Sequence, residues 1–501
     1  MKLRTLSKRV VAALGATALG VATMTTTSMG AQAVPNAEPP STPVPIATPD
    51  GVLMSYIINT RHVNPGAVRS TENAVKRAGG TVVQSWPEVG VVVAHSSRAS
   101  FLGEIRKFSQ VESAGPTRTA EVVEGTPGKA APKGKNASGY RTKVKKKVGE
   151  ENADSSAAVA TDPREVDQWN NDLIGATEAH KTTDGDRSVL VGVVDSGIDA
   201  DHPDLKENID ARNSVNCTKA GTVDTSATGW QPTTSDHGTH VAGTIAAARN
   251  GVGIVGVAPN VRMASIKVVS DEGFIYPEYA VCGFIWAAEH GVDVTNNSYY
   301  VDPFEFWCGD QDLQAPAKEA VRRAVEFSTK KGVVHAAAAG NSAYDLANKT
   351  TDEGSPNDTT PVNRVINNSC TDIPAELPGV VTVSAIDKAA LKADFSNYGD
   401  GVIDVAAPGR SILSTVVANN GYGLKSGTSM ASPHAAGVLA LLKSTHPRAT
   451  PQELIDLLRA QATDHECAAT DRPSDQKCTG DAAYNSFYGD GVINALAAVQ
   501  G

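Results

Sequence analysis

The sequence predicts a doubly wound α/β domain with a mostly parallel sheet, preceded by a small α+β unit. Continuous apolar runs such as 189–194 recur through the later part of the chain, as expected of strands buried on both faces. Helix-forming stretches lie between several of these runs, which is the alternation of a sheet covered by helices on both sides. The first part of the chain has shorter elements in a different order.

The composition narrows the function classes. The 501 residues contain 45 Lys and Arg against 55 Asp and Glu, which gives a formal net charge of −10. This mild acidity argues against a protein that binds nucleic acid. Hydrophobic residues make up 41% of the chain and aromatic residues only 5%, so we expect cores built from Ala, Val, Ile and Leu.

Residues 1–33 have the pattern of a secretory signal peptide. A basic start is followed by an apolar stretch at 10–24 and by the small-residue cleavage site Ala31-Gln32-Ala33. The alternative is a membrane anchor, but the polar run 25–28 ends the apolar stretch early, and no later stretch is long and apolar enough to cross a membrane. We therefore expect an extracellular protein without a stable membrane anchor.

Export changes how the six cysteines are interpreted, because disulfides persist in oxidising compartments. Cys217, Cys282, Cys308, Cys370, Cys467 and Cys478 can form three disulfides, and no Cys-x-x-Cys pair suggests a zinc cluster. Cys467 and Cys478 are the pair closest in sequence and the one we expect to be bonded. The other pairings stay open.

After a Pro-rich spacer at 34–50, a small α+β unit is expected over residues 51–123. Its predicted strands are 53–58, 81–85, 90–95 and 111–122, and its predicted helices are 67–78 and 100–108. The order β-α-β-β-α-β is that of a ferredoxin-like split β-α-β unit.

A linker follows at residues 124–165. It holds eight Lys and Arg residues between 129 and 147, within a stretch rich in Gly, Pro and Ala. Three interpretations stay open: a protease-accessible linker, a site for an anionic partner, or a solvated tether. A flexible basic segment between two folded units would be cut easily in each case.

From residue 166 the α/β pattern begins. Expected strands are 189–194, 261–269, 292–296, 333–339 and 380–386, and expected helices are 237–249, 277–290, 315–331 and 450–462. Thr450 is the predicted N-cap of the last of these helices, with Pro451 in its first turn. In such sheets ligands bind outside the carboxyl ends of the strands.

Asp195 directly follows the first buried strand, and His237 and His240 open a helix rich in small residues. Taken alone, the aspartate could be a helix cap or a metal ligand, and the two histidines could form a metal site. The zincin pattern, however, needs His-Glu-x-x-His, and here the spacing is i+3 without the glutamate. We therefore disfavour zinc.

Ser429 stands in a small-residue turn directly before an apolar helix-forming run at 435–442. Such a serine can be an ordinary N-cap, or a nucleophile placed where free N–H groups stabilise negative charge. With Asp195 and His237 it completes an orienting acid, a general base and a nucleophile. Asn341 ends a buried strand and could donate to an oxyanion, together with the backbone N–H of Ser429.

Four blocks resemble the signature motifs of the subtilisin family of serine peptidases. They are Asp195-Ser196-Gly197, His237-Gly238-Thr239-His240-Val241-Ala242-Gly243, Ala339-Gly340-Asn341 and Gly427-Thr428-Ser429-Met430-Ala431-Ser432-Pro433-His434. Their order, Asp then His then Ser, is the subtilisin order. The resemblance covers about residues 166–501.

This resemblance implies a subtilisin-type sheet and endopeptidase activity through an acyl-enzyme. By position, Asp195 orients, His237 is the base, Ser429 attacks and Asn341 completes the oxyanion hole. It also implies that residues 51–123 are a propeptide that assists folding and inhibits the enzyme, with maturation in the linker. Polypeptides are the expected substrates and a monomer the expected state. The alternative is a catalytically inactive binding protein with the same fold.

The resemblance further points to Ser298, Tyr299, Tyr300 and Gly340 as substrate-binding residues. The family has Ser-Leu-Gly-Gly where this chain has Ser298-Tyr299-Tyr300-Val301. Tyr300 could therefore narrow the specificity pocket or reshape its rim. The alternative is that both tyrosines turn away and serve packing.

No cofactor is expected for the chemistry, but the resemblance makes a structural calcium ion plausible. Asp204 and Asn250 match calcium ligands of the family, Gln168 could match a third, and loop carbonyls would complete an oxygen cage. The alternative for the loop at Asn250 is a helix C-cap with glycine.

Overall fold

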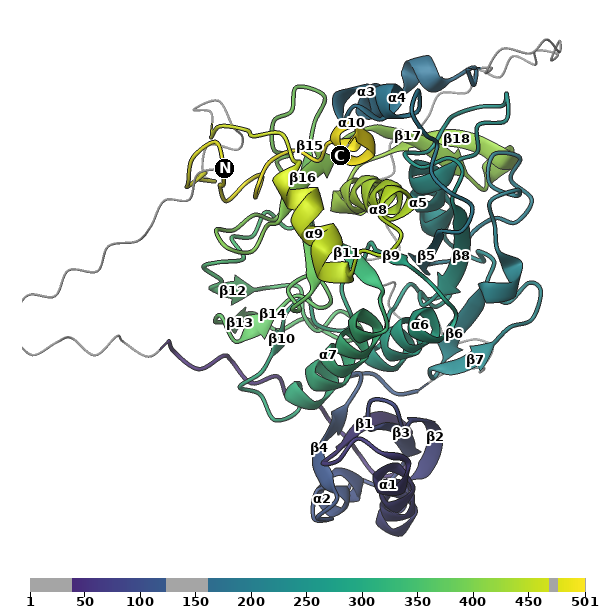
Figure 1. Cartoon of the computed structure of the whole chain (residues 1–501). Helices are drawn as coiled ribbons and strands as arrows, with labels where there is room; N and C mark the ends of the chain where they lie inside the picture. The colour runs from purple at the N-terminus through teal and green to yellow at the C-terminus, as the bar shows by residue number, and fades with distance from the viewer. Residues whose placement is uncertain (1–37, 123–160, 468–475, 501) are drawn as a thin grey trace, which may run out of the picture. The chain divides into compact units, whose positions relative to one another are not determined.

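The computed structural model describes residues 38–122, 161–467 and 476–500 (Figure 1). The expected signal peptide at 1–33 and most of the linker at 124–165 lie outside the described residues. Every element named below belongs to one compact unit, which begins at residue 40.

The predicted sheet is present and is mostly parallel. In spatial order it contains β16 (Val405–Pro408), β15 (Val380–Ile386), β11 (Val334–Ala338), β9 (Val294–Asn297), β5 (Leu190–Asp195), β8 (Arg262–Lys267), β6 (Val215–Lys219) and β7 (Thr222–Asp224). All neighbouring strands run parallel except β6 and β7. The direction of the winding reverses between β5 and β9, because the chain places β8 on one side of β5 before it adds β9 on the other.

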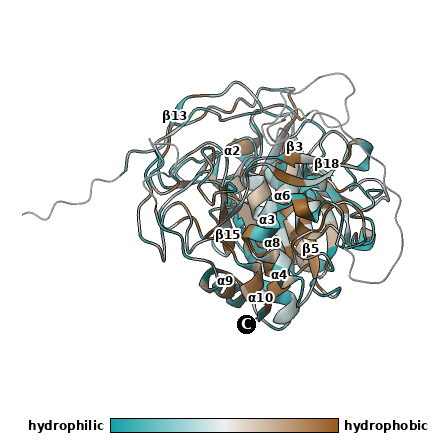
Figure 2. Ribbon diagram, turned by 90° about the horizontal axis from the view of Figure 1, so that it is seen from above, coloured by the Kyte–Doolittle hydropathy of each residue, from teal (hydrophilic) through white to brown (hydrophobic). Residues whose placement is uncertain are grey.

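Helices cover both faces of this sheet (Figure 1). One core holds α5 (His237–Ala246), α8 (Thr428–Thr445), α9 (Pro451–Ala460) and α10 (Ala495–Gln500), and the other holds α6 (Pro277–Glu289) and α7 (Ala315–Lys330). The continuous apolar runs of the strands follow from this double cover, since both faces of each strand are buried. Figure 2 shows the hydrophobic residues gathered in central elements such as β5.

The α+β unit has the predicted order of elements. These are β1 (Met54–Thr60), α1 (Pro65–Ala78), β2 (Thr81–Trp86), β3 (Val91–Ser96), α2 (Phe101–Ile105) and β4 (Val111–Pro116). The antiparallel sheet has the order β2-β3-β1-β4. The last strand is shorter than predicted and ends at Pro116.

Both faces of this small sheet are covered, because successive side chains of β1 point alternately into two different cores. Tyr56 and Ile58 pack with α1 and α2, whereas Ile57 joins the core that contains α6 and α7. In β3, Val92 and Val93 divide in the same way. One sheet face of this unit therefore packs on the α/β domain.

Several short elements were not predicted. They are β6, β7 and β16 of the large sheet, α3 (Trp169–Leu173), α4 (Ala176–Ala179), β10 (Trp307–Cys308), β12 (Thr351–Asp352), β13 (Arg364–Val365), β14 (Cys370–Thr371), β17 (Ile412–Val416), β18 (Gly421–Lys425) and the 3₁₀ turns Glu165–Asp167, Ala211–Asn213 and Ala418–Asn420. A fully buried ion pair between Arg364 and Asp352, at 2.5 Å, fixes β12 to β13.

The cysteines form three disulfides, Cys217–Cys282, Cys308–Cys370 and Cys467–Cys478. The last pair confirms the one predicted from sequence separation. The capping prediction is also confirmed, since Thr450 and Glu453 form a reciprocal capping box at the start of α9. These are local features that sequence spacing can reveal.

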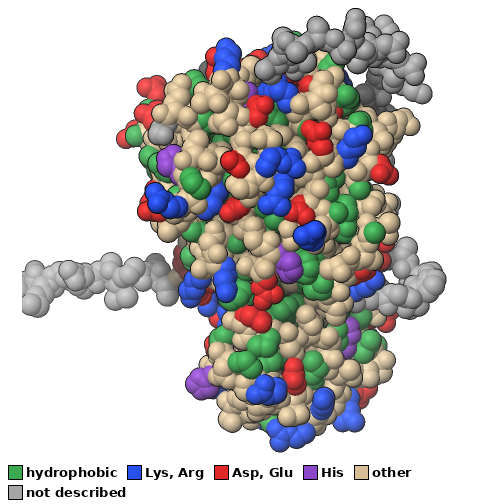
Figure 3. Space-filling view, turned by 45° about the vertical axis from the view of Figure 1, so that its right-hand side comes forward, with side chains coloured by type: hydrophobic (Ala, Val, Ile, Leu, Met, Phe, Trp, Pro, Cys, Tyr) green, Lys and Arg blue, Asp and Glu red, His purple; other side chains and the backbone are tan. Residues whose placement is uncertain are grey.

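On the face shown in Figure 3, acidic and basic side chains lie interspersed, with hydrophobic side chains in small groups between them. This pattern agrees with the modest net charge of the sequence. Among the described residues, no helix combines the length and the apolar composition that crossing a membrane requires.

Candidate active site

Asp195 and His237 form a buried acid–base pair at the carboxyl end of β5. Asp195 is the last residue of the strand and His237 is the first residue of α5. The Nδ1 atom of His237 lies 2.9 Å from each carboxylate oxygen of Asp195. The side chains are 1% and 6% exposed. This bond engages Nδ1 and leaves Nε2 to exchange a proton with a nucleophile.

Ser429 is the second residue of α8, and Gly427 is the N-cap. The interpretation of Ser429 as an ordinary N-cap is therefore wrong, because a glycine without a side chain precedes the helix. The Ser429 hydroxyl donates to the carbonyl of Ser298 at 3.3 Å, and the Ser298 hydroxyl donates to the carbonyl of Ser429 at 3.0 Å. These bonds join the start of α8 to the end of β9.

Asn341 is held with its amide in a defined orientation. Its Oδ1 atom accepts hydrogen bonds from the backbone N–H of Thr428 at 2.7 Å and from the Thr428 hydroxyl at 2.9 Å. These two donors identify the carbonyl end of the amide, so Nδ2 is the end left to donate elsewhere. Asn341 is exposed. The arrangement is that of a donor presented to a bound molecule.

The turn before Asn341 depends on Gly340 and on Asn397, which the sequence analysis missed. Gly340 has φ +98°, and a Cβ there would collide with the Asn397 amide. That amide donates to the carbonyl of Ala339 at 2.8 Å and accepts from the N–H of Ser342 at 3.1 Å. No sequence motif marks Asn397, because it meets the turn only in the folded chain.

The other histidines near these residues are buried and hydrogen-bonded to the protein. His240 Nε2 lies 3.1 Å from the carbonyls of both Ile412 and Gly423, and burial lowers its pKa to about 3. His434 Nδ1 lies 2.7 Å from the carbonyl of Met430, and burial lowers its pKa to about 4. His237 bonds to Asp195, whereas His240 bonds to backbone carbonyls. The bonded nitrogens of the two histidines therefore do not point to a common metal position.

The candidate substrate-binding residues separate into two groups. Ser298 and Gly340 lie at the carboxyl ends of β9 and β11, and each bonds to the first residues of α8. Tyr299 packs in the core with α6 and donates to Asn297 Oδ1 at 3.0 Å, as in the packing alternative. Tyr300 is half-buried, and its hydroxyl accepts from Asn357 Nδ2 at 3.1 Å.

Asp204 lies against the loop 248–256 and is fully buried. Its Oδ2 atom accepts from the N–H of Ile254 at 3.0 Å. Its Oδ1 atom is buried and has no hydrogen-bond partner among the described residues. Burial raises the pKa of Asp204 to about 7. A buried carboxylate with an unused oxygen is suited to a cation.

Three more side-chain oxygens surround the same loop. Asn250 Oδ1, Gln168 Oε1 and Asp162 Oδ1 each accept a backbone N–H of the loop, at 3.0, 2.9 and 2.6 Å. Asp162 was not predicted, and burial raises its pKa to about 6. An all-oxygen set of this kind fits a hard ion such as Ca²⁺.

Comparison with known proteins agrees with this geometry. The model of the Subtilase family matches residues 186–491. Subtilisin from Bacillus pumilus is 35% identical over 314 residues, which cover 62% of this chain and 91% of that protein. The crystal structure of fervidolysin from Fervidobacterium pennivorans, a keratinolytic enzyme related to subtilisin, matches with a TM-score of 0.60 and 25% identity, covering 90% of this chain and 62% of that one.

The crystal structure of the epidermin leader peptide processing serine protease from Staphylococcus aureus shares the fold, with a TM-score of 0.62 and 20% identity over 89% of this chain and 98% of that one. The family match spans the Asp195–His237 pair, Asn341 and Ser429. With a close relative matched over nine tenths of its length, these findings establish that the chain belongs to the subtilase family and is a subtilisin-like serine endopeptidase.

Proposed function

We propose that this endopeptidase uses Ser429 as its nucleophile, His237 as its general base, Asp195 as the orienting acid and Asn341 as an oxyanion donor. The observation that carries the proposal is the bond from His237 Nδ1 to both oxygens of a buried aspartate. This bond holds the imidazole in the tautomer that can accept a proton at Nε2.

In the first half of the reaction, Ser429 Oγ attacks the carbonyl carbon of a peptide bond and its proton passes to His237 Nε2. The carbonyl oxygen becomes an oxyanion, which receives hydrogen bonds from the Ser429 N–H and from Asn341 Nδ2. The C–N bond then breaks, and the imidazolium returns the proton to the leaving amine. Water repeats these steps on the acyl-enzyme and releases the acid.

The resting hydroxyl must turn before it can react, because it donates to Ser298 O at 3.3 Å. This bond is long, and catalytic hydrogen bonds often align only when substrate is bound. A substrate strand lying beside the end of β9 would compete with Ser429 for hydrogen bonds to the carbonyl and the hydroxyl of Ser298. We infer that substrate binding and alignment of the nucleophile are coupled at this residue.

Substitution of Asn341 tests the oxyanion role. We expect Asn341→Leu to lower kcat about 10²–10³-fold, the size of the loss when the asparagine donor of subtilisin is removed. KM should change little, because the lost bond forms to the transition state. Steady-state hydrolysis of a chromogenic peptide measures both constants. Ser342→Ala is the matched control, since the neighbouring side chain is exposed and should leave kcat unchanged. A large rise in KM at constant kcat would contradict the role.

For the substrate pocket we propose Ser298, Gly340 and Tyr300 as contacts. Support comes from the bonds of Ser298 and Gly340 to the first residues of α8 and from the half-buried ring of Tyr300. The family has a glycine at the position of Tyr300, so a bulky ring with an amide partner on Asn357 would reduce the room for a large side chain. A preference for smaller side chains at the position before the cut bond follows.

We further propose that residues 51–123 are an inhibitory propeptide, that the linker is cut on maturation, and that the enzyme acts outside the cell. The packing of the small sheet on α6 and α7 supports the first point. The three disulfides and the pattern of residues 1–33 support the last.

A structural calcium ion at the loop 248–256 completes the proposal. Asp204, Asn250 and Gln168 would hold it, with Asp162 as a further acidic group. When bound, the ion would stabilise the ionised forms of two carboxyl groups whose pKa burial raises, and it would hold the loop in place. Its role would be structural and not chemical.

Calcium should raise the thermal stability of the protein, and Asp204→Asn should abolish this effect. In a Ser429→Ala background that prevents self-digestion, excess Ca²⁺ is expected to raise Tm by at least ~2 °C relative to a chelator. Differential scanning calorimetry measures the shift. Asp201→Asn removes an exposed acid three residues away and should keep the full shift. An unchanged shift in Asp204→Asn would place calcium elsewhere.

A further inference from the structure

Residues 40–46, which we call the anchor segment, lie in the stretch predicted to be a spacer. The segment has no helix or strand, but two of its side chains are buried. Ser41 is 2% exposed and Val44 is 6% exposed, and Val44 belongs to the core that holds α6 and α7. Residues of the predicted spacer are therefore in contact with the α/β domain.

The docking is made by hydrogen bonds to the loop 310–314. Ser41 donates its backbone N–H to one oxygen of Asp310 at 2.8 Å and its hydroxyl to the other at 2.6 Å. Gln311 Nε2 donates to the carbonyl of Ser41 at 2.8 Å. Asn367 Nδ2 donates at 3.0 Å to Asp310 Oδ2, the oxygen that also accepts the Ser41 N–H, and so helps to orient this carboxylate.

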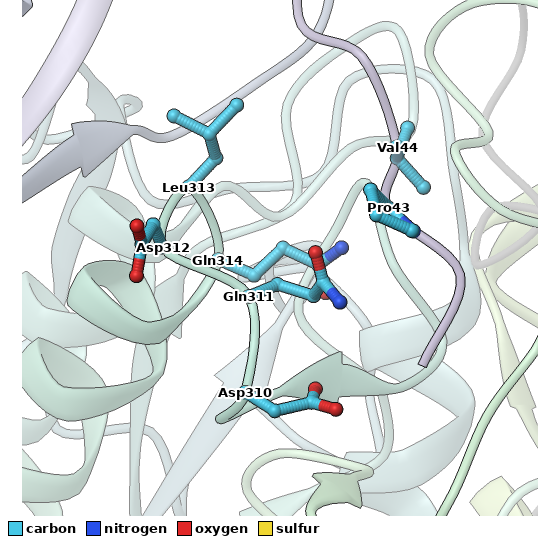
Figure 4. A pocket seen from close by; sticks show the side chains of 7 residues that line it. All are labelled: Pro43, Val44, Asp310, Gln311, Asp312, Leu313 and Gln314. Carbon is cyan, nitrogen blue, oxygen red and sulfur yellow. The ribbon is translucent and has the colours of Figure 1, made fainter. Parts of the chain in front are cut away.

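The next residue, Thr42, bonds to the edge of β13. Thr42 donates its N–H to the carbonyl of Val365 at 2.8 Å, and its hydroxyl accepts the N–H of Val365 at 2.9 Å. Beyond it, Pro43 and Val44 line a pocket of about 290 Å³ with the loop 310–314. Figure 4 shows Gln311 and Gln314 reaching into the space between Pro43 and that loop.

The composition of the segment suits this site. Pro40, Pro43 and Pro45 have no N–H to satisfy and favour an extended conformation, so ordering the segment costs little entropy. The N–H groups of Ser41 and Thr42 each have a partner on the α/β domain. The anchor segment has no helical or strand periodicity, but its prolines and its bonded N–H groups suit it to the surface formed by the loop 310–314 and β13.

We propose that the loop 310–314 and the edge of β13 form a second binding site for the N-terminal domain, which holds the anchor segment after the linker is cut. The inference rests on the proposed inhibitory role of residues 51–123 and deepens it. The first site is the sheet face on α6 and α7, and the anchor segment tethers the same fragment at a separate place. Two linked contacts release more slowly than one.

The test uses the full precursor with Ser429→Ala and a recognition sequence for a site-specific protease inserted in the linker. After cutting, the C-terminal fragment is immobilised and the loss of the N-terminal fragment is followed by biolayer interferometry. Deleting residues 34–44 should speed release roughly a hundredfold, since it removes a buried valine and several hydrogen bonds. Ser41→Ala and Asp310→Ala should each speed release about three- to tenfold.

The double variant of Ser41 and Asp310 should speed release by less than the product of the two single effects, because the bond from the Ser41 hydroxyl to Asp310 is lost in both single variants. Asp456→Ala, an exposed acid on α9, is the control and should match the parent. Equal release rates for the parent and the deletion variant would overturn the second site and leave the inhibitor proposal standing. If the fragments of the parent separate at once, both proposals fail.

Discussion

Ser429→Ala is expected to lower kcat roughly 10⁶-fold, the size of the loss when the catalytic serine of subtilisin is removed. The physical reason is that the Ser429 side chain supplies the attacking oxygen. Alanine keeps the backbone N–H at the start of α8, but this N–H can only donate to the oxyanion and cannot attack the carbonyl carbon. The remaining rate should come from substrate binding and the oxyanion donors alone. The parent enzyme and Ser429→Ala are expressed and purified separately in the mature form. Hydrolysis of a fluorogenic peptide then measures the ratio of their kcat values.

Two further variants sharpen this result. His237→Ala added to Ser429→Ala should cost little more, because the base has no function without the nucleophile. Ser444→Ala, at the other end of α8, should retain full activity, since its hydroxyl bonds to Ala440 O and the N–H of Asp186 and, among the described residues, to no active-site group. A serine-directed phosphonylating reagent should label the parent and not Ser429→Ala. Undiminished peptide hydrolysis by Ser429→Ala would remove Ser429 from the mechanism.

Arg118→Ala is expected to weaken the hold of the N-terminal domain on the α/β domain by about 10²–10³-fold. Arg118 pairs with Glu278 at 2.6 Å, and the two side chains are 3% and 0% exposed. Its guanidinium also lies 3.7 Å from the ring centre of Tyr276. Removing one member of a buried ion pair costs about 3–5 kcal/mol, because the other charge stays buried without its partner.

The Glu278 carboxylate would stay buried and ionised without a cation in Arg118→Ala. It lies in the first turn of α6, where the helix dipole favours a negative charge, and it also accepts the hydroxyls of Ser55 at 3.1 Å and Thr117 at 3.2 Å. Two hydroxyls cannot replace a cation. All three partners come from the N-terminal domain, so Glu278 connects it to α6.

The dissociation constant of the two fragments measures the effect, in the linker-cut precursor that carries Ser429→Ala. Adding Glu278→Leu to Arg118→Ala should recover much of the lost affinity, since the double variant buries no unpaired charge. Arg69→Ala removes an exposed arginine of α1 and should bind like the parent. Equal constants for Arg118→Ala and the parent would show that the pair contributes nothing to the contact.

The sequence alone determined the parts of this protein that repeat a local pattern. Five strands of the large sheet, β5, β8, β9, β11 and β15, follow from continuous apolar runs, and the capping box of Thr450 follows from residue types three positions apart. The candidate active-site residues could be found because Asp195, His237 and Asn341 each stand beside a strand or helix end, and Ser429 stands in a recognisable block. These features need only neighbouring residues to be recognised.

Tertiary structure decided the rest. Asn397 holds the Gly340 turn by a hydrogen bond to Ala339, which lies 58 positions earlier in the chain. Tyr299 points inward because it packs in the core that contains α6. The anchor segment was predicted as a spacer because its prolines show no periodicity, and its partner Asp310 is 269 positions away from Ser41. Contacts of this kind become visible only when the folded sheet brings distant loops together, since nothing in either segment alone specifies the other.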